Sequence, residues 1–141
     1  MIQGKRPKLV IWCTELAAIR TITDAMVRTT DLVWTRDAQT FLRAAGDESP
    51  PLAVIVDNSA AKATAIESLQ AIRKSRPEAR RILMTDYCDL AIIIQGLHTE
   101  AVQRIVYKPV HPAELLAAIG MQSVVTVPQR LYTSPATRAA G

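Results

Sequence analysis

The sequence predicts an α/β protein with a doubly wound, five-stranded parallel sheet between two layers of helices. Short, continuous apolar runs alternate along the chain with segments that carry apolar residues at helical spacing. The runs do not alternate with polar residues, as expected of strands that are buried on both faces. Strict alternation of strands and helices favours parallel strands joined by right-handed crossovers.

The first two strand–helix units lie in the N-terminal third of the chain. Residues 9–12 form a continuous apolar strand, and residues 15–29 carry apolar side chains at helical spacing. The side-chain oxygen of Thr14 is the expected N-cap of that helix. Residues 31–35 predict a second short strand. A helix is expected over 38–45. It ends at a glycine, and a polar turn that contains proline follows.

The third unit contains the clearest strand. Residues 52–56 are apolar and unbroken, and they end at Asp57. Residues 61–75 then carry apolar side chains on one helical face and stop before Pro77, because proline disfavours helix in the residue that precedes it. A carboxylate is therefore expected at the end of a buried strand.

The fourth unit pairs a strand over 81–84, which ends at Thr85, with a helix over 90–97 that Asp89 is expected to cap. Residues 90–94 are more apolar than a half-exposed helix requires. The helix is therefore either well buried or the site of an exposed apolar interface, and the sequence leaves both open.

The fifth strand is expected within 101–107, and Lys108 and a proline follow it. The last helix, 112–119, has a proline in its first turn, where proline is favoured. We therefore expect one domain over 1–120. The segment 121–141 is rich in proline, threonine, serine and alanine, so it is expected to be a tail or linker that adds little to the core.

Composition narrows the function. Of the 141 residues, 49% are apolar, which is enough to build a buried core. The net charge is +4, but the basic residues are scattered, which favours solvated surface charge over nucleic-acid binding. No run resembles a signal peptide or reaches membrane-spanning length, so a cytoplasmic location without a membrane partner is expected.

Metal, redox and nucleotide chemistry have little support in the sequence. Cys13 and Cys88 lack the spacing of a metal or redox pair and are expected to be buried, inert thiols. His98 is expected on the surface at a helix end. The glycines form no phosphate-binding loop, which argues against a nucleotide site.

Three reactive side chains follow three different strands. Asp57, Thr85 and Lys108 are separated by 28 and then 23 residues. Ligands of open parallel sheets bind beyond the carboxyl ends of the strands, where these side chains should meet. A carboxylate can attack a phosphoryl group, a hydroxyl can donate to its oxygens, and an ammonium can neutralise its charge. The three residues are therefore candidates for phosphoryl chemistry.

Three segments, each ending in or containing one of these residues, carry a family resemblance: residues 52–57, 82–85 and 106–109. Through them the chain resembles, over residues 8–119, the response-regulator receiver domains of two-component (phosphorelay) signalling. The resemblance implies a flavodoxin-like, three-layer α/β/α fold with receiver topology. It also implies that Asp57 is the phosphoacceptor, that Thr85 reads out the phosphoryl group, and that Lys108 precedes a cis bond to Pro109. The implied cofactor is Mg²⁺, and the implied partners are a histidine kinase, a phosphotransfer protein or an output protein.

Departures from the family pattern predict a degenerate, pseudo-receiver variant. Where the family has two acidic residues that help bind Mg²⁺, this chain has Cys13 and Thr14. Mg²⁺ prefers carboxylate oxygens, so its binding is expected to be weak or absent, with Glu15 and Asp57 as the remaining metal candidates. The other departures are Asp86 in place of a small residue, Ile105 in place of an aromatic switch residue, and a missing proline after Asp57.

Three functions stay open. The first is a degenerate receiver, not an enzyme, that works through protein–protein interaction or as a homodimer, using the helix at 90–97, the fifth strand and the helix at 112–119. The second is a working phosphoacceptor that a histidine kinase phosphorylates on Asp57. The third is a small flavodoxin-like enzyme or nucleotide binder, which the missing catalytic clusters disfavour. In either receiver, Lys108 is expected to pair with Asp57 or Asp86, because buried carboxylates need a counter-charge.

Overall fold

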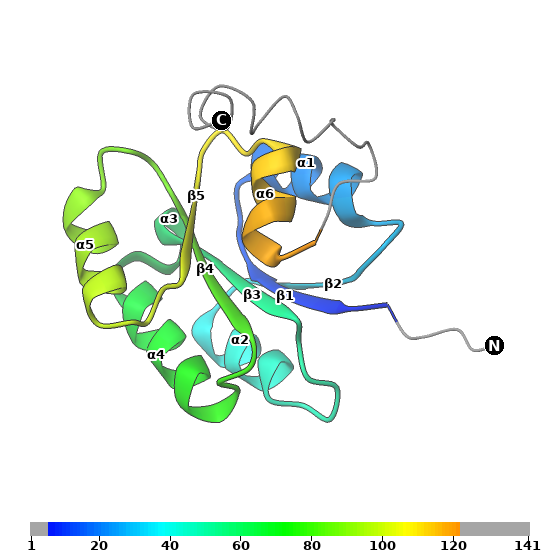
Figure 1. Cartoon of the computed structure of the whole chain (residues 1–141), viewed down its shortest axis with the longest axis horizontal. Helices are drawn as coiled ribbons and strands as arrows, with labels where there is room; N and C mark the ends of the chain where they lie inside the picture. The colour runs from blue at the N-terminus through cyan, green and yellow to red at the C-terminus, as the bar shows by residue number, and fades with distance from the viewer. Residues whose placement is uncertain (1–5, 122–141) are drawn as a thin grey trace, which may run out of the picture.

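The computed structural model describes residues 6–121, which form a five-stranded parallel sheet with helices on both faces (Figure 1). The strand order is β2-β1-β3-β4-β5, so β3 is central. The predicted fold class is confirmed. The expectations for the tail concern residues 122–141, which lie outside the described part of the chain.

The strands follow the predicted apolar runs, and every neighbouring pair is parallel. β1 and β3 are buried along their whole length, as their unbroken apolar sequences predict. β5 begins three residues later than predicted, at Arg104. The strands are β1 (Lys8–Trp12), β2 (Asp31–Thr35), β3 (Ala53–Asp57), β4 (Arg80–Thr85) and β5 (Arg104–Tyr107).

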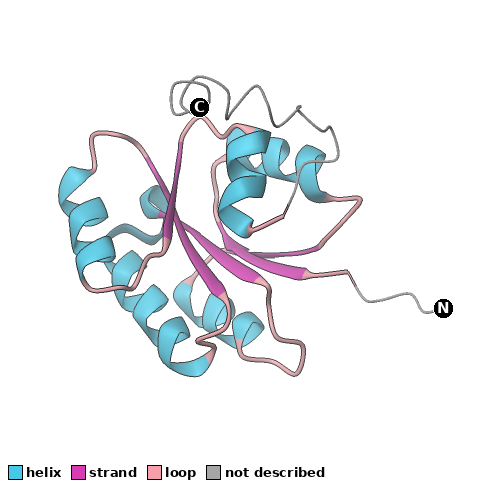
Figure 2. Cartoon of the chain, viewed as in Figure 1, coloured by secondary structure: helices cyan, strands magenta, loops and turns pink. Residues whose placement is uncertain are grey.

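The helices divide between the two faces of the sheet, and Figure 2 shows the resulting three layers. The cluster around Ile11 and Ile55 packs against α1 and α6, whereas the cluster around Val10 and Val54 packs against α2, α4 and α5. Alternate strand residues therefore serve opposite cores. The helices are α1 (Leu16–Met26), α2 (Ala38–Ala45), α3 (Asn58–Ala61), the 3₁₀ turn η1 (Lys62–Thr64), α4 (Ala65–Ser75), α5 (Leu90–His98) and α6 (Pro112–Ile119).

Three predictions about helix starts are wrong. Thr14 does not cap α1, because the N-cap residue is Glu15 and no side chain makes a cap bond there. The helix predicted over 61–75 begins only at Ala65, after α3 and η1. Asp57 accepts a hydrogen bond from the backbone N–H of the residue two positions on and so starts α3, and Lys62 has a φ of 53°, which interrupts the helical path. Asp89 stands at the N-cap of α5, but its side chain makes no cap bond.

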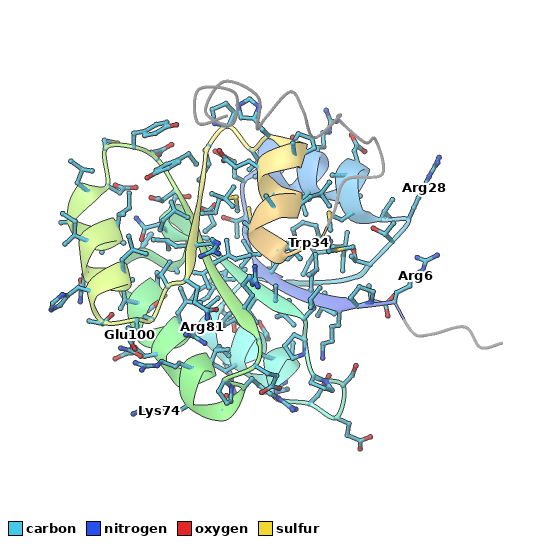
Figure 3. All side chains as sticks on the ribbon, in the orientation of Figure 1. Arg6, Arg28, Trp34, Lys74, Arg81 and Glu100 are labelled. Atoms are coloured by element: carbon cyan, nitrogen blue, oxygen red, sulfur yellow. The ribbon has the colours of Figure 1, made fainter. Side chains whose placement is uncertain are left out.

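A buried arginine fixes the connection between α5 and β5. Arg81 of β4 is 5% exposed, and its guanidinium donates to the carbonyls of Glu100 and Ala101. Figure 3 labels Arg81 and Glu100 where the end of α5 approaches β4. Glu100 has a φ of 65°, a left-handed conformation that turns the chain from α5 toward β5. These bonds hold the C-terminal end of α5 close to the sheet.

Gly96 allows α5 to pack closely on its neighbours. A Cβ atom at this position would lie 2.6 Å from Cγ2 of Val102 and 2.9 Å from Cδ1 of Ile66. Both neighbours are buried, and the stiff valine side chain has little room to move. Close approach of α5 to α4 and to the segment before β5 therefore requires glycine here.

We predict that Gly96→Ala destabilises the domain by about 1–3 kcal/mol through overpacking. The same change in an exposed helix interior stabilises by roughly 0.5–1 kcal/mol, so the sign of the effect tests the packing. Urea denaturation measures it, with Gln95→Ala on the exposed side of α5 as the control. Equal or greater stability of Gly96→Ala would contradict the close packing of α5 on Val102 and Ile66.

Candidate functional site

The carboxylate of Asp57 lies at the carboxyl end of the central strand and is completely buried. Its Oδ1 atom accepts hydrogen bonds from the backbone N–H of Ser59 at 3.1 Å and from the Ser59 hydroxyl at 3.0 Å. Lys108 supplies the counter-charge, with Nζ 2.8 Å from the same Oδ1. The predicted pairing of Lys108 with a carboxylate is therefore confirmed.

Lys108 reaches this position from the end of β5. Its backbone N–H donates to the carbonyl of Thr85, and the peptide bond to Pro109 is cis, as the resemblance implied. Nζ also donates to Ser59 Oγ at 3.0 Å. Burial acts to lower the pKa of the lysine, but the hydrogen bond and charge of Asp57 outweigh burial and raise that pKa above its ordinary value.

The second oxygen of Asp57 faces a thiol. Sγ of Cys13 lies 3.5 Å from Oδ2 and is placed to donate to it. Burial, assisted by the charge of Asp57, raises the pKa of this thiol to about 11. Cys13 is therefore a neutral donor, the opposite of the charged acceptor that an acidic residue would provide at this point.

Glu15 and Asp86 lie further out, around a pocket of about 290 Å³ whose lining also includes Lys108 and Val110. The Glu15 carboxylate is half exposed, and its Oε1 lies 3.7 Å from Lys108 Nζ. The ammonium group thus lies within 4 Å of both the buried carboxylate of Asp57 and the outer one of Glu15. Glu15 and Asp86 therefore both lie close to the pair formed by Asp57 and Lys108.

The residues present do not fit Mg²⁺, the cofactor that the resemblance implies. A magnesium ion needs several oxygen ligands in octahedral geometry, at least one of them usually a carboxylate. Here Oδ1 of Asp57 already accepts two hydrogen bonds and pairs with the ammonium group of Lys108, and Oδ2 faces the thiol. Between residues 6 and 121, no three His, Cys, Asp or Glu side chains are grouped to hold a metal ion.

The hydroxyl of Thr85 is directed away from Asp57, toward α5. Thr85 is buried, and its Oγ1 donates to Oδ2 of Asp89 at 2.5 Å. The same carboxylate oxygen accepts from Nδ2 of Asn58 at 3.3 Å. Hydrogen bonding to Thr85 is the largest cause that lowers the pKa of Asp89. The structure thus brings Asp57 and Lys108 together but gives Thr85 a different partner.

Sequence reasoning missed two residues of this site. Ser59 follows Asp57 by two positions, and an aspartate often accepts the backbone N–H two residues on, so this partner was open to prediction. Asp89 was expected only as a helix cap. Asp89 follows Thr85 by four residues, which is close enough for a hydrogen bond between their side chains. Whether the carboxylate bonds to Thr85 or to the first turn of the helix that follows depends on tertiary packing.

An aromatic pair extends the site toward the surface. The rings of Tyr87 and Tyr107 stack with centroids 4.0 Å apart and an angle of 8° between their planes. Tyr107 shares the face of Ile105, as strand alternation predicts, and both pack against the same core. Tyr87 is 68% exposed. The stack therefore ties the loop after β4 to β5.

The two cysteines differ in environment. Cys13 is buried, as expected, but Cys88 is exposed, so the prediction of a buried thiol is wrong there. Cys88 stands in the short loop between β4 and α5, which is too short to fold back over it. His98 is exposed at the end of α5, as predicted.

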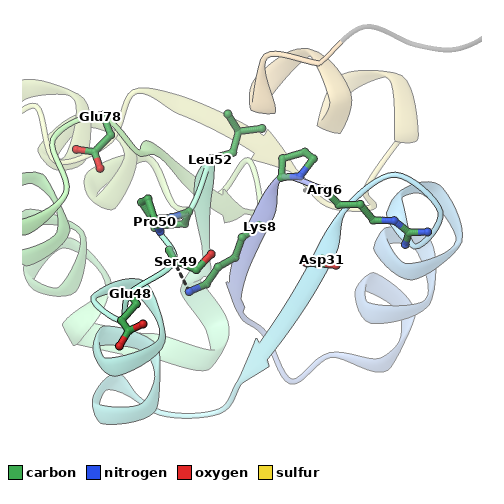
Figure 4. A pocket seen from close by; sticks show the side chains of 10 residues that line it. Arg6, Lys8, Asp31, Glu48, Ser49, Pro50, Leu52 and Glu78 are labelled. Carbon is green, nitrogen blue, oxygen red and sulfur yellow. Dashed lines mark hydrogen bonds between the residues drawn. The ribbon is translucent and has the colours of Figure 1, made fainter. Parts of the chain in front are cut away.

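A larger pocket, about 650 Å³, lies at the opposite, amino end of the strands (Figure 4). Its lysine, Lys8, is almost fully buried and donates to the carbonyls of Ala44 and Ser49 and to Asp47, all within 2.7 Å. Those contacts satisfy its three N–H donors. The pocket is large enough for a ligand, but the ammonium group of Lys8, its buried charge, is already bonded to the protein.

Within the described residues, no helix combines the length and apolar character needed to cross a lipid bilayer.

Comparison with known proteins shows the fold. No protein-family model and no curated protein matches the chain. The signal receiver domain of an HD domain-containing protein from Pseudomonas fluorescens Pf-5 has a TM-score of 0.71 and 22% identity, over 82% of this chain and 93% of that one. A response regulator receiver domain from Clostridium thermocellum has a TM-score of 0.70 and 22% identity, over 81% and 91%. An adenylate cyclase from Rhodopirellula baltica has a TM-score of 0.72 and 16% identity, over 82% and 85%.

We predict that the two thiols react at very different rates. A disulfide reagent such as DTNB, applied near pH 8, should modify exposed Cys88 rapidly, and it should modify Cys13 only when the domain opens, because that thiol is buried and protonated. Mass spectrometry of Cys88→Ser isolates the slow reaction. Rapid modification of Cys13 in that variant would contradict the neutral, enclosed thiol.

We predict that Lys108→Met costs about 3 kcal/mol of unfolding free energy, because it leaves the buried Asp57 carboxylate without its counter-charge. The double variant Asp57→Asn/Lys108→Met should lose less than the sum of the two single losses. Glu15→Gln is the control, since its half-exposed carboxylate should contribute under about 1 kcal/mol. Additive losses in denaturant titrations would rule out the coupled pair.

Proposed function

We propose that this chain is a cytoplasmic, receiver-type module of two-component signal transduction that has a degenerate phosphorylation site and works through protein–protein interaction rather than as an enzyme. The observation that carries the proposal is the environment of Asp57: Oδ1 pairs with Lys108, and Oδ2 faces the neutral thiol of Cys13. The receiver fold of the similar structures supports the signalling class.

The charge around Asp57 supports slow or absent phosphorylation. Phosphoryl transfer to a carboxylate depends on positive charge that stabilises the phosphoryl and reacting oxygens, and a divalent metal normally supplies the largest share. The candidate metal ligands, Glu15 and Asp57, are separated by the ammonium group of Lys108. Asp86 adds a negative charge at the pocket. One lysine that already neutralises Asp57 leaves little positive charge for an incoming phosphoryl group.

An exposed apolar row supports recognition of a protein partner. The row begins in the loop before α5 and continues along that helix with the spacing of one helical face. Only part of the apolar segment 90–94 is therefore buried, and the rest is open to a partner. The α5 row consists of Tyr87, Leu90, Ile94 and Leu97, which are 68%, 62%, 63% and 46% exposed.

Tyr87, at the start of the α5 row, stacks on Tyr107 of β5, so the row adjoins the surface of α5, β5 and α6 that the sequence singled out. We propose that a histidine kinase, a phosphotransfer protein or an output protein binds there, or that a second copy of the chain does. Exposed apolar patches on otherwise polar surfaces commonly mark such interfaces.

The alternative is a working phosphoacceptor in which a histidine kinase phosphorylates Asp57. The retained trio favours it: Asp57 and Lys108 are in contact at the carboxyl edge, and Thr85 ends the neighbouring strand. In that case a carboxylate oxygen of Asp57 would form a bond to phosphorus while the bond to the donor breaks. The small enzyme or nucleotide binder is less well supported, because the 290 Å³ pocket has neither a glycine loop nor a metal cluster among its described residues.

We predict that wild-type protein incubated with acetyl phosphate gains little or no phosphoryl mass with or without millimolar Mg²⁺. Cys13→Asp, which places a carboxylate beside Asp57, should increase Mg²⁺ affinity and make modification dependent on the metal. Intact-mass spectrometry measures the added group, and acetate is the leaving product.

The controls decide between the two receiver functions. Asp57→Asn and the double variant Cys13→Asp/Asp57→Asn should show no added mass. Cys13→Ser tests whether loss of the thiol alone has an effect, because serine adds no charge. Prompt, Mg²⁺-dependent modification of the wild type that disappears in Asp57→Asn would refute the degenerate site and establish the phosphoacceptor.

A further inference from the structure

The side chain of Asp89 lies near two sets of hydrogen-bond donors, and in the structure it bonds to only one of them. In the structure its Oδ2 accepts from Thr85 Oγ1 at 2.5 Å and from Asn58 Nδ2 at 3.3 Å. Asp89 is also the N-cap residue of α5, where an aspartate usually accepts from the backbone N–H groups of the first turn, and here it makes no such bond.

The residues on the two sides of this competition belong to different parts of the fold. Thr85 ends β4, and Asn58 directly follows Asp57 at the end of β3. The other candidate partner of the carboxylate is the first turn of α5, which carries Leu90 of the exposed α5 row. The pKa of Asp89 lies below its ordinary value, chiefly through its hydrogen bond to Thr85, and the charge of Lys108 adds to that effect.

The observed arrangement is not fully satisfied. Among the described residues, the buried Oδ1 of Asn58 has no hydrogen-bond partner. The α5 N-terminus likewise lacks its side-chain cap. The cap bond gained on release would offset part of the hydrogen bonding lost at Thr85 and Asn58. A small free-energy difference between the two positions is the requirement for a switch.

We propose that Asp89 is a two-position latch: it either holds the Thr85 hydroxyl and the Asn58 amide or releases them and caps α5. In the latched position Thr85 has no proton to donate toward Asp57. In the released position the threonine hydroxyl becomes free and the first turn of α5 becomes ordered. The carboxyl edge of the sheet is thereby coupled to the α5 row. The use of this coupling in signalling rests on the function proposed above, whereas the latch itself does not.

Amide hydrogen exchange in a double-variant cycle tests the latch. Thr85→Val removes the hydroxyl donor, so Asp89 should move to the cap and slow exchange of the Ala91 and Ile92 amides about fivefold, the ratio that a typical N-cap bond produces. Asp89→Ala should leave those two rates close to the wild-type values, because the wild-type carboxylate does not cap. The double variant Thr85→Val/Asp89→Ala should return to the wild-type rates.

Controls make the result decisive. Asp86→Asn removes a neighbouring charge of the same loop and should change neither rate. Thr85→Ala repeats the test with a smaller side chain, and continued protection of the Val54 amide shows that each variant is folded. Exchange that stays unchanged in both Thr85 variants, or that slows equally in the double variant, would overturn the latch. The cycle uses neither Mg²⁺ nor a phosphodonor, so prompt modification of Asp57 would overturn the proposed function and leave the latch intact.

Discussion

The buried ion pair between Asp57 and Lys108 is the constraint on which the rest of the site depends. An ionised carboxylate with no exposed surface is tolerated only when charge and hydrogen bonds compensate for lost hydration. Lys108 provides the charge, and Ser59 provides two donors. Because Lys108 lies at the end of β5 and Asp57 at the end of β3, the pair also ties the central strand to the sheet edge across β4.

A neutral residue at position 13 is compatible with the charge balance of this ion pair. Asp57 and Lys108 already sum to zero charge, so a thiol with a pKa of about 11 adds a donor without adding charge. A second carboxylate at position 13 would leave an unbalanced negative charge beside Asp57 unless a cation joined it. Cys13 therefore adds a hydrogen-bond donor beside Asp57 without disturbing the charge balance of the buried pair.

Much of the fold was predictable because unbroken apolar runs and their polar ends are local signals. The bounds of β2, α2 and α6 match the predicted ones, and Asp57 was expected at the end of the central strand. The errors arise where one polar side chain chooses among several partners. Asp57 starts α3 through Ser59, Glu15 rather than Thr14 precedes α1, and Asp89 bonds backward to Thr85. Those choices depend on the neighbouring strands, which periodicity does not specify.

Strand alternation divides the carboxyl edge into two halves. Cys13, Asp57 and Lys108 share the parity of the core residues that face α1 and α6, whereas Thr85 and Asn58 share the parity of those that face α5. The first half contains the charge pair and is closed by its own contacts. The second half contains the hydrogen bonds of Asp89, which involve an exposed loop and a helix without a side-chain cap. Asn58 directly follows Asp57 and its amide donates to Asp89, so it connects the two halves of the edge. In the proposed function, a signal that enters at Asp57 and leaves at α5 would pass from the first half to the second, where Thr85 and Asn58 meet Asp89.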